Sequence, residues 1–176
     1  MLLLTALSSL LFVIIGLFFA FVAVYSHIVG NAKGALFLPS HKKKINTMIE
    51  LAQIKEGTRI IDLGSGDGAV VLESACKGAH AVGVEFNPFL VCYSRWRVRH
   101  KGFTNHIRII QGDLMEYSLN NVDIVFLYLL PKTLLSINEK LRLELPQGAH
   151  VVSNTFPLPG WSPIEERNGV FLYRQN

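Results

Sequence analysis

The chain has 176 residues, of which 50% are hydrophobic and 17% are charged. Its mean hydropathy of +0.34 is high for an ordinary soluble domain, and its charge is too high for a protein with several membrane spans. Two cysteines exclude a disulfide framework and a multi-cysteine zinc module, and Cys76 and Cys92 are interpreted as packing residues in a reducing compartment. The composition therefore predicts one apolar anchor joined to one folded domain.

The first 32 residues contain no Lys, Arg, Asp or Glu. The apolar stretch Leu2–Tyr25, taken as a helix at about 1.5 Å per residue, is roughly 36 Å long and exceeds a hydrocarbon core of about 30 Å. A cleaved signal peptide would have a basic start, a shorter apolar stretch and a small-x-small cleavage site, none of which is present. We therefore predict a transmembrane anchor over residues 1–29.

The whole net charge of +4 lies between the anchor and the domain, because thirteen basic residues balance thirteen acidic ones from Ile45 onward. The basic residues before that point are Lys33, Lys42, Lys43 and Lys44. Such a cluster after a span predicts that the following domain lies on the cytoplasmic or an equivalent inner face. We expect a basic juxtamembrane linker over residues 30–44 and a domain over residues 45–176, whose neutrality argues against a nucleic-acid partner.

Short β-branched runs alternate with helical stretches along the expected domain. In chain order the predicted elements are helix Ile45–Gln53, strand Arg59–Leu63, helix Gly68–Lys77, strand His80–Glu85, helix Pro88–Lys101, strand Ile107–Gln111, strand Val122–Leu127, helix Pro131–Glu144 and strand His150–Thr155. The dipeptide Asn168-Gly169 then predicts a hairpin between Ile164–Arg167 and Val170–Arg174. This alternation predicts a doubly wound, Rossmann-like α/β domain with a parallel sheet and an antiparallel edge.

Polar residues follow the predicted strands at the edge where ligands bind in such sheets. The first strand runs into Asp62-Leu63-Gly64-Ser65-Gly66-Asp67-Gly68, and Glu85 ends the second strand. The glycines permit a tight turn and close backbone approach to a ligand, and Glu85 is placed to accept hydrogen bonds from two ribose hydroxyls. Asp113 follows the third strand, where it is placed to accept from an adenine amino group.

The same turn also satisfies the dinucleotide fingerprint Gly64-x-Gly66-x-x-Ala69, in which a pyrophosphate rests on a helix amino terminus. Asp62 and Asp67 flank the turn, and a pyrophosphate at roughly 4 to 6 Å from them would cost about a kcal/mol or more per charge pair. S-adenosylmethionine (SAM) has no phosphate and carries an ammonium and a sulfonium. The charge pattern therefore favours SAM over NAD as the cofactor.

Five stretches carry a resemblance to a known family: Gly34–Ser40 (GALFLPS), Ile61–Gly68 (IDLGSGDG), Val82–Pro88 (VGVEFNP), Gly112–Leu114 (GDL) and Val122–Pro131 (VDIVFLYLLP). The chain resembles the seven-β-strand (class I) SAM-dependent methyltransferases. Within them it is most similar to the membrane-anchored protein-lysine methyltransferases of the adenine nucleotide translocase and ATP synthase c-subunit type, with their prokaryotic relatives. The resemblance implies a strand order of 3-2-1-4-5-7-6, SAM across the first two strands and a lysine acceptor. The implied cofactor-binding residues are Asp62, Gly64, Ser65, Gly66, Asp67, Glu85, Phe86 and Asp113.

The Asn-Pro-Pro-Tyr type motif of many amino methyltransferases is absent after the fourth predicted strand, where only Tyr128 and Pro131 stand near its place. Methyl transfer to a lysine requires that the amine be held in line, stripped of water and deprotonated. Tyr128 and Asn154, at the ends of the fourth and fifth strands, are the predicted catalytic residues, with Phe156 and Trp161 lining a channel. The alternatives are a sheet-end hydrogen bond for Tyr128, a turn role for Asn154 and loop anchors for the other two.

The remaining polar residues have structural interpretations. Asp67 is alternatively a helix cap, and Arg95, Arg97, Arg99 and Lys101 are expected to form a solvated helix face. No histidine or cysteine spacing indicates a metal site. Tethering near the bilayer predicts a lysine of a membrane protein as the acceptor, while a lipid-like or quinone-like acceptor and a non-catalytic SAM-binding assembly factor stay open as alternatives.

Overall fold

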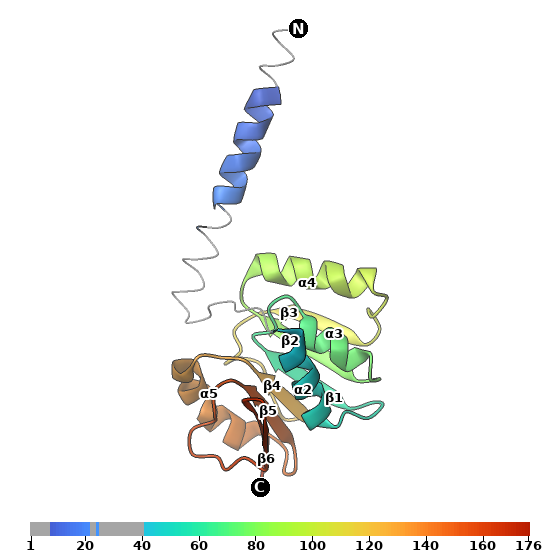
Figure 1. Cartoon of the computed structure of the whole chain (residues 1–176), viewed down its shortest axis with the longest axis vertical. Coiled ribbons are helices and arrows are strands. Elements are labelled where there is room, and N and C mark those ends of the chain that lie inside the picture. Colours follow the sequence, from blue (N-terminus) through green and yellow to red (C-terminus); the bar gives the residue numbers. More distant parts are fainter. Residues whose placement is uncertain (1–7, 22–23, 25–40) are drawn as a thin grey trace. The chain divides into compact units, whose positions relative to one another are not determined.

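A computed structural model describes residues 8–21, 24 and 41–176, and the chain divides into two units, Met1–Leu36 and Phe37–Asn176 (Figure 1). In the first unit, residues 8–21 form a helix whose large apolar side chains are exposed by 41% at Ile15 to 75% at Phe12. None of the helices within the described ranges combines the length and the hydropathy that a bilayer crossing requires. The predicted span Leu2–Tyr25 lies partly outside those ranges.

The second unit alternates helices and strands along the chain. Its elements are α2 (Lys42–Ala52), β1 (Arg59–Leu63), α3 (Ala69–Ala75), β2 (His80–Glu85), α4 (Pro88–His100), β3 (Ile107–Gln111), β4 (Ile124–Leu127), α5 (Pro131–Glu144), β5 (His150–Asn154), β6 (Glu165–Arg167) and β7 (Val170–Arg174). One seven-stranded sheet has the order β3-β2-β1-β4-β5-β7-β6. Only β7 runs antiparallel to its neighbours, β5 and β6. The predicted α/β fold and strand order are therefore confirmed.

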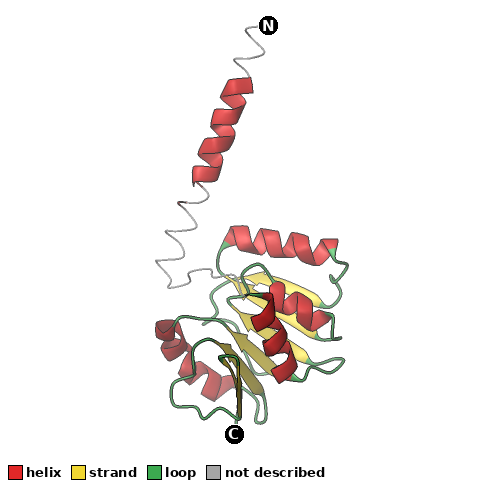
Figure 2. Cartoon of the chain, in the orientation of Figure 1, coloured by secondary structure: helices red, strands yellow, loops and turns green. Residues whose placement is uncertain are grey.

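The two faces of the sheet are covered unequally (Figure 2). Helices α2, α3 and α4 bury their apolar sides against one face, together with strand residues such as Ile60, Ile109 and Phe126. On the other face, α5 packs through Leu134, Ile137 and Leu141. The connections 112–123 and 155–164 contain neither helix nor strand, so within residues 41–176 α5 is the one helix on that face. The sheet over β2 and β3 is consequently left thinly covered there.

Helix α2 begins at Lys42, one turn before the predicted start, so Lys42–Lys44 belong to a helix rather than to a linker. Lys44 Nζ donates to the carbonyl oxygens of Asn168 and Gly169, and Asn168 Nδ2 donates to Thr47 Oγ1 at 3.4 Å. Asn168 and Gly169 have φ of 53° and 65°, as a tight hairpin turn requires. The start of the domain is thereby tied to its last hairpin.

Cys76 and Cys92 differ from their expected role. Both cysteines are exposed, so the prediction that they are packing residues is wrong. Cys76 caps the carboxyl end of α3, and Cys92 lies in α4 next to the buried Val91 but outside the core. Their small size and apolar character suggested burial, whereas the helical period turns both away from the sheet.

Candidate functional site

The carboxyl ends of four strands meet at one edge of the sheet. Leu63 of β1 pairs with Val84 of β2 on one side and with Leu127 of β4 on the other, and Leu127 pairs with Ser153 of β5. The residues that follow these positions are Gly64, Glu85, Tyr128 and Asn154. Parallel register therefore brings together side chains that lie 90 residues apart in the sequence, as the sequence analysis expected.

The turn after β1 folds back onto the end of β2. The backbone N–H groups of Gly64 and Ser65 both donate to the carbonyl oxygen of Val84, at 2.8 and 3.0 Å. Gly64 has a φ of 84°, and a Cβ there would lie 3.0 Å from Leu129 Cδ2. Any other residue at this position would be strained in its backbone and crowded by its neighbour, so glycine is needed here for the turn itself.

Glu85 holds the same turn through its side chain. Its Oε2 accepts from the backbone N–H of Gly66 at 2.9 Å, and its Oε1 accepts from that of Asn87 at 2.7 Å. The residue is only 7% exposed. Because each carboxylate oxygen has two lone-pair sites, both oxygens keep an acceptor site for ligand hydroxyls. Glu85 thus has a structural role, and its geometry leaves room for the binding role, which stays a prediction.

Asp62 is a buried acid in an acidic surrounding. It is 5% exposed, and within residues 41–176 no hydrogen bond reaches its carboxyl group. Burial first, and then the charges of Glu85 and Asp67, raise the pKa of Asp62 from an ordinary value of 3.8 to about 8. A cationic ligand group beside this carboxyl would supply the missing partner and favour its ionised form. Asp62 is therefore the residue of this edge best suited to a cation.

Asp67 has partners of its own. Its Oδ1 accepts from the backbone N–H of Ala69 at 3.2 Å at the start of α3, and its Oδ2 pairs with Arg97 of α4 at 2.5 Å. The bond to Ala69 ties Asp67 to the first residue of α3, whereas the N-cap position itself is occupied by Gly68. The prediction of a solvated face is wrong for Arg97, whose side chain is only 22% exposed. Arg95 is exposed as predicted, although it also donates to the Ile109 carbonyl at 2.9 Å.

Ser65 packs beneath the turn. Its hydroxyl is buried and has no partner within the described residues. A Cβ at Gly83 of β2 would lie 2.6 Å from Ser65 Oγ and 2.9 Å from Ile109 Cδ1. The turn therefore depends on a glycine in the middle of the neighbouring strand, a contact that sequence reasoning missed. In the sequence, the only sign of this contact is that small residues occupy positions 64, 65 and 83.

Phe86 and Asp113 lie beside Glu85 at the same edge. Both are partly buried, and the backbone N–H of Gly112 donates to the carbonyl oxygen of Glu85 at 3.1 Å. Asp113 Oδ1 accepts from the backbone N–H of Met115 at 2.9 Å. The cofactor roles predicted for Ser65, Phe86 and Asp113 stay predictions.

Tyr128 and Asn154 stand on the other side of the glycine turn. Tyr128 is partly exposed, and no hydrogen bond joins its hydroxyl to another described residue. Asn154 is 2% exposed, and its Oδ1 accepts from the Thr155 hydroxyl at 3.1 Å. The Tyr128 hydroxyl thus has no partner among the described residues, whereas the oxygen of Asn154 accepts one hydrogen bond and keeps a second acceptor site.

Trp161 is a loop anchor. Its Nε1 donates to Asn138 Oδ1 at 2.6 Å, its ring packs edge-on to Tyr173, and the Arg142 guanidinium lies 4.8 Å above the ring centroid. Phe156 packs against the same core on the α5 side of the sheet. These contacts agree with the anchor alternative and leave the predicted channel without support from Trp161.

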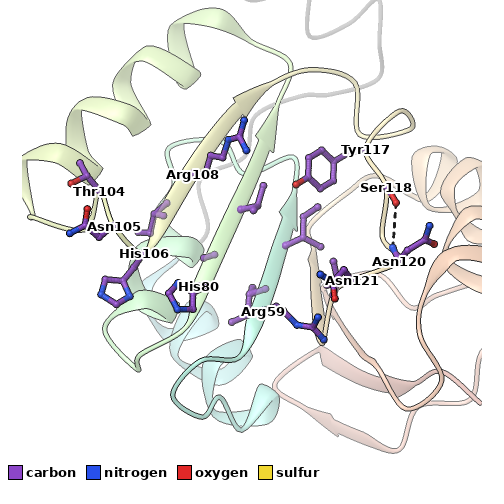
Figure 3. Close-up of a pocket in the computed structure, with 16 residues that line it drawn as sticks. Arg59, His80, Thr104, Asn105, His106, Arg108, Tyr117, Ser118, Asn120 and Asn121 are labelled. Atoms are coloured by element: carbon purple, nitrogen blue, oxygen red, sulfur yellow. Dashed lines mark hydrogen bonds between the residues drawn. The ribbon is translucent and has the colours of Figure 1, made fainter.

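A cavity of about 670 Å³ lies at the opposite ends of the strands. Figure 3 shows Arg59 and His80 at the amino ends of β1 and β2, and Arg108 and Tyr117 among the other residues that line the cavity. None of the predicted cofactor or catalytic residues lines it. None of the helices within residues 41–176 covers this part of the sheet, and the sequence signals this only through the shortness of segment 112–123.

Residues 62–165 match the family described as the ANTKMT methyltransferase domain. The human lysine N-methyltransferase of the ATP synthase c-subunit is 35% identical over 127 residues, which cover 72% of this chain and 54% of that protein. Mouse adenine nucleotide translocase lysine N-methyltransferase is 35% identical over 129 residues, covering 73% and 56%. The chain thus spans about half the length of these curated relatives.

A solved structure is also similar. The crystal structure of an RNA methyltransferase from Salinibacter ruber, in complex with S-adenosyl-L-homocysteine, matches with a TM-score of 0.74 and 35% identity over 78% of this chain and 92% of that one. The strand order, the glycine turn after β1 and the acid at the end of β2 define a domain of the class I methyltransferase fold. The chain belongs to the ANTKMT methyltransferase domain family.

Proposed function

We propose that the chain is a SAM-dependent protein-lysine N-methyltransferase, attached to a membrane near its amino terminus and acting on a lysine of a membrane-associated protein. The names of the relatives above support the acceptor, since both are lysine N-methyltransferases. Because the chain spans only about half of those proteins, the acceptor class rests on similarity alone. The site geometry supports the cofactor independently.

The observation that carries the cofactor is the buried carboxyl of Asp62, which has no hydrogen-bond partner within residues 41–176, next to the buried Glu85. SAM supplies a methyl group already activated on a sulfonium and presents an ammonium, and it has no phosphate. A pyrophosphate would instead keep Asp62 protonated and add about a kcal/mol or more of repulsion against each neighbouring carboxylate, such as that of Glu85. Asp62 would hold the ammonium, and Glu85 would accept from the ribose hydroxyls.

For the transfer itself, Tyr128 and Asn154 are the proposed catalytic residues. A lysine amine with an ordinary pKa of about 10.4 must lose its proton and be aligned with the methyl group. The Tyr128 hydroxyl, which has no partner in the described part of the chain, would orient the amine. The side-chain oxygen of Asn154 accepts from the Thr155 hydroxyl and keeps a second acceptor site, through which it would accept a hydrogen bond from the amine.

The membrane attachment is supported by the helix over residues 8–21. A helix that is apolar on all sides is stable against protein or lipid, and these side chains are exposed. The uncharged stretch continues on both sides of it, from Leu2 to Tyr25. With the basic cluster behind this stretch, we propose a single-pass anchor and a domain on the cytoplasmic or an equivalent inner face.

Methyl-labelled SAM added to the full chain with isolated membranes tests the function. Label in a discrete protein band, lost on Glu85→Ala, is the expected result. Label in the organic extract would point to a lipid-like or quinone-like acceptor, and cofactor binding without any transfer would point to an assembly factor. Protease added to sealed vesicles of known orientation tests the topology, because the domain should survive attack from the outer face.

RNA methylation is a second candidate function, favoured by the likeness to the Salinibacter structure. The domain gives it little electrostatic support, since from Ile45 onward acidic and basic residues balance. The same labelling reaction with total RNA in place of membranes separates the two candidates. Label in RNA that resists protease would replace the lysine proposal.

A further inference from the structure

The side of α4 that faces away from the sheet carries a row of rings. The buried residues of the helix are Val91, Ser94 and Val98. Tyr93, Trp96 and His100 lie on the opposite side, because 3.6 residues per turn place them about half a turn away from the buried row. The rings stack in order, with centroids 5.9 Å apart for Tyr93 and Trp96 and 5.4 Å apart for Trp96 and His100.

This row is open to solvent. Tyr93 is 50% exposed and Trp96 is 57% exposed. Exposed single apolar residues are common on protein surfaces, but a Tyr and a Trp stacked on each other along one helix form a continuous patch. Arg97, whose guanidinium lies 5.8 Å from the Tyr93 ring, borders it. The arrangement is preformed, since the stacked rings already share one orientation.

The charges that α4 itself places beside the row are all positive. Helix α4 contains no Asp or Glu, and Arg95, Arg97 and Arg99 are followed by Lys101. Arg97 is paired with Asp67 and Arg95 with a carbonyl, as described above. Arg99 and Lys101 are exposed, and neither makes an ion pair within residues 41–176. Two unpaired cations therefore flank the rings.

We propose that this aromatic face of α4, formed by Tyr93, Trp96 and His100 with Arg99 and Lys101 beside it, docks on an anionic lipid surface. Indole and phenol rings settle at headgroup depth, with their apolar bodies toward the acyl chains and their polar ends toward water. Arginine and lysine stems lie along the same interface while their charges meet anionic headgroups. The inference rests on the proposed membrane attachment and adds a second contact to it.

Docking along α4 would give the domain a defined orientation. The helix starts at Pro88, three residues after Glu85, and Asn87 caps it through the backbone N–H of Phe89. The cofactor edge of the sheet therefore lies next to the amino end of the docked helix. A lysine at the membrane surface would meet the site without a long excursion of the domain, which is the advantage that a second contact supplies over a tether alone.

Tryptophan fluorescence of the full chain tests the docking, because Trp96 and Trp161 are its two tryptophans. The chain is reconstituted with vesicles of phosphatidylcholine, with or without phosphatidylserine, that carry brominated acyl chains. In Trp161→Phe the remaining Trp96 should shift to the blue and be quenched at least twofold more on the anionic vesicles. In Trp96→Phe the remaining Trp161, held by Asn138, should show neither change. If Trp161→Phe folds poorly, the fluorescence of Trp96 is obtained instead by subtracting the spectrum of Trp96→Phe from that of the wild type.

The charge requirement has its own matched pair of variants. Arg99→Gln/Lys101→Gln should lower the quenching to the level seen on neutral vesicles, with about a fivefold loss of interfacial affinity per cation. Lys77→Gln/Lys132→Gln, which removes two exposed cations elsewhere, should leave it unchanged. Equal quenching in both pairs would overturn the electrostatic contact.

Three further results would overturn the docking itself. The first is Trp96 fluorescence that anionic brominated vesicles do not quench. The second is shielding of Trp96 from a soluble quencher by single-stranded RNA in the absence of lipid. The third is self-association of the chain that Trp96→Ala abolishes. If lysines of membrane proteins are methylated while Trp96 stays unquenched, the docking inference is wrong and the proposed function holds. If Trp96 is quenched but the chain transfers no methyl group, the docking holds and the proposed function is wrong.

Discussion

The carboxylate of Glu85 accepts a hydrogen bond from the backbone N–H of Gly66, so the end of β2 fixes the turn that follows β1. The second oxygen of the same carboxylate accepts from the N–H of Asn87, at the start of α4. One side chain thus joins two strands and a helix at the edge where the cofactor is proposed to bind. Changing it disturbs both the turn and the ligand contact.

Glu85→Ala is expected to abolish detectable binding of S-adenosylhomocysteine and to lower the free energy of unfolding by about 1–3 kcal/mol, because one buried and one partly buried N–H donor lose their acceptor. Calorimetric titration and denaturant unfolding measure the two effects. Glu139→Ala, at an exposed position of α5, is the matched control and should change neither. Ligand binding that survives Glu85→Ala would contradict the proposed ribose contact.

The raised pKa of Asp62 predicts a pH dependence of stability in the ligand-free protein. Since its folded pKa of about 8 lies above the ordinary value of 3.8, the folded state binds the extra proton between these values. The free energy of unfolding should therefore fall as pH rises from 4 to 8, by up to about 1.4 kcal/mol per pH unit. Asp62→Asn should remove this slope. If the free energy of unfolding falls with pH equally in both proteins, Asp62 is not the group responsible.

Cofactor binding should also release a proton from Asp62. At pH 7 a carboxyl with a pKa of about 8 is mostly protonated, and a ligand ammonium beside it favours ionisation. Titration with S-adenosylhomocysteine in two buffers of different ionisation heat should show up to about one proton released per ligand. The release should be absent in Asp62→Asn. An equal release in both proteins would place the titrating group elsewhere.

Gly83→Ala is expected to destabilise the ligand-free domain by about 1–3 kcal/mol, because the new Cβ would meet Ser65 Oγ at 2.6 Å and Ile109 Cδ1 at 2.9 Å. Denaturant unfolding measures the loss. Gly112→Ala is the control, since a Cβ at Gly112 meets nothing within 4 Å and its φ is not positive. If both variants lose equally, the strand contact is not the cause.

Tyr128→Phe separates binding from transfer. With the hydroxyl removed and the ring kept, affinity for S-adenosylhomocysteine should stay within about twofold while kcat falls about 10- to 100-fold. Tyr117→Phe, which changes a hydroxyl beside the cavity at the other end of the sheet, should leave both values unchanged. Normal turnover in Tyr128→Phe would remove this residue from the catalytic machinery.

Much of the fold was predictable from local patterns. The bounds of β1, β2, β3, α5 and β7 agree with the sequence prediction residue for residue. Short β-branched runs between turn residues mark buried parallel strands, and proline marks the first turn of α4 and α5. The strand order followed from the family resemblance, since the alternation of elements leaves several orders open.

The contacts that were missed join residues far apart in the chain. The pairing of Arg97 with Asp67 and the close approach of Ser65 to Gly83 depend on how α4 and β2 pack against the turn. The residues of one helix face look alike in a sequence whether they meet solvent, a carboxylate or a carbonyl. The candidate site residues were predicted because they stand at or just after the carboxyl ends of strands, whereas their partners carry no such positional mark.

The position of β7 has a consequence for synthesis of the chain. Although β7 follows β6 in the chain, it lies between β5 and β6, and the turn before it is held by Lys44 of α2. Until Val170–Arg174 have been made, β5 has an unpaired edge and β6 has no neighbour in the sheet. A variant that lacks Val170–Arg174 would therefore leave the sheet open beyond β5, although every residue of the proposed site precedes this strand.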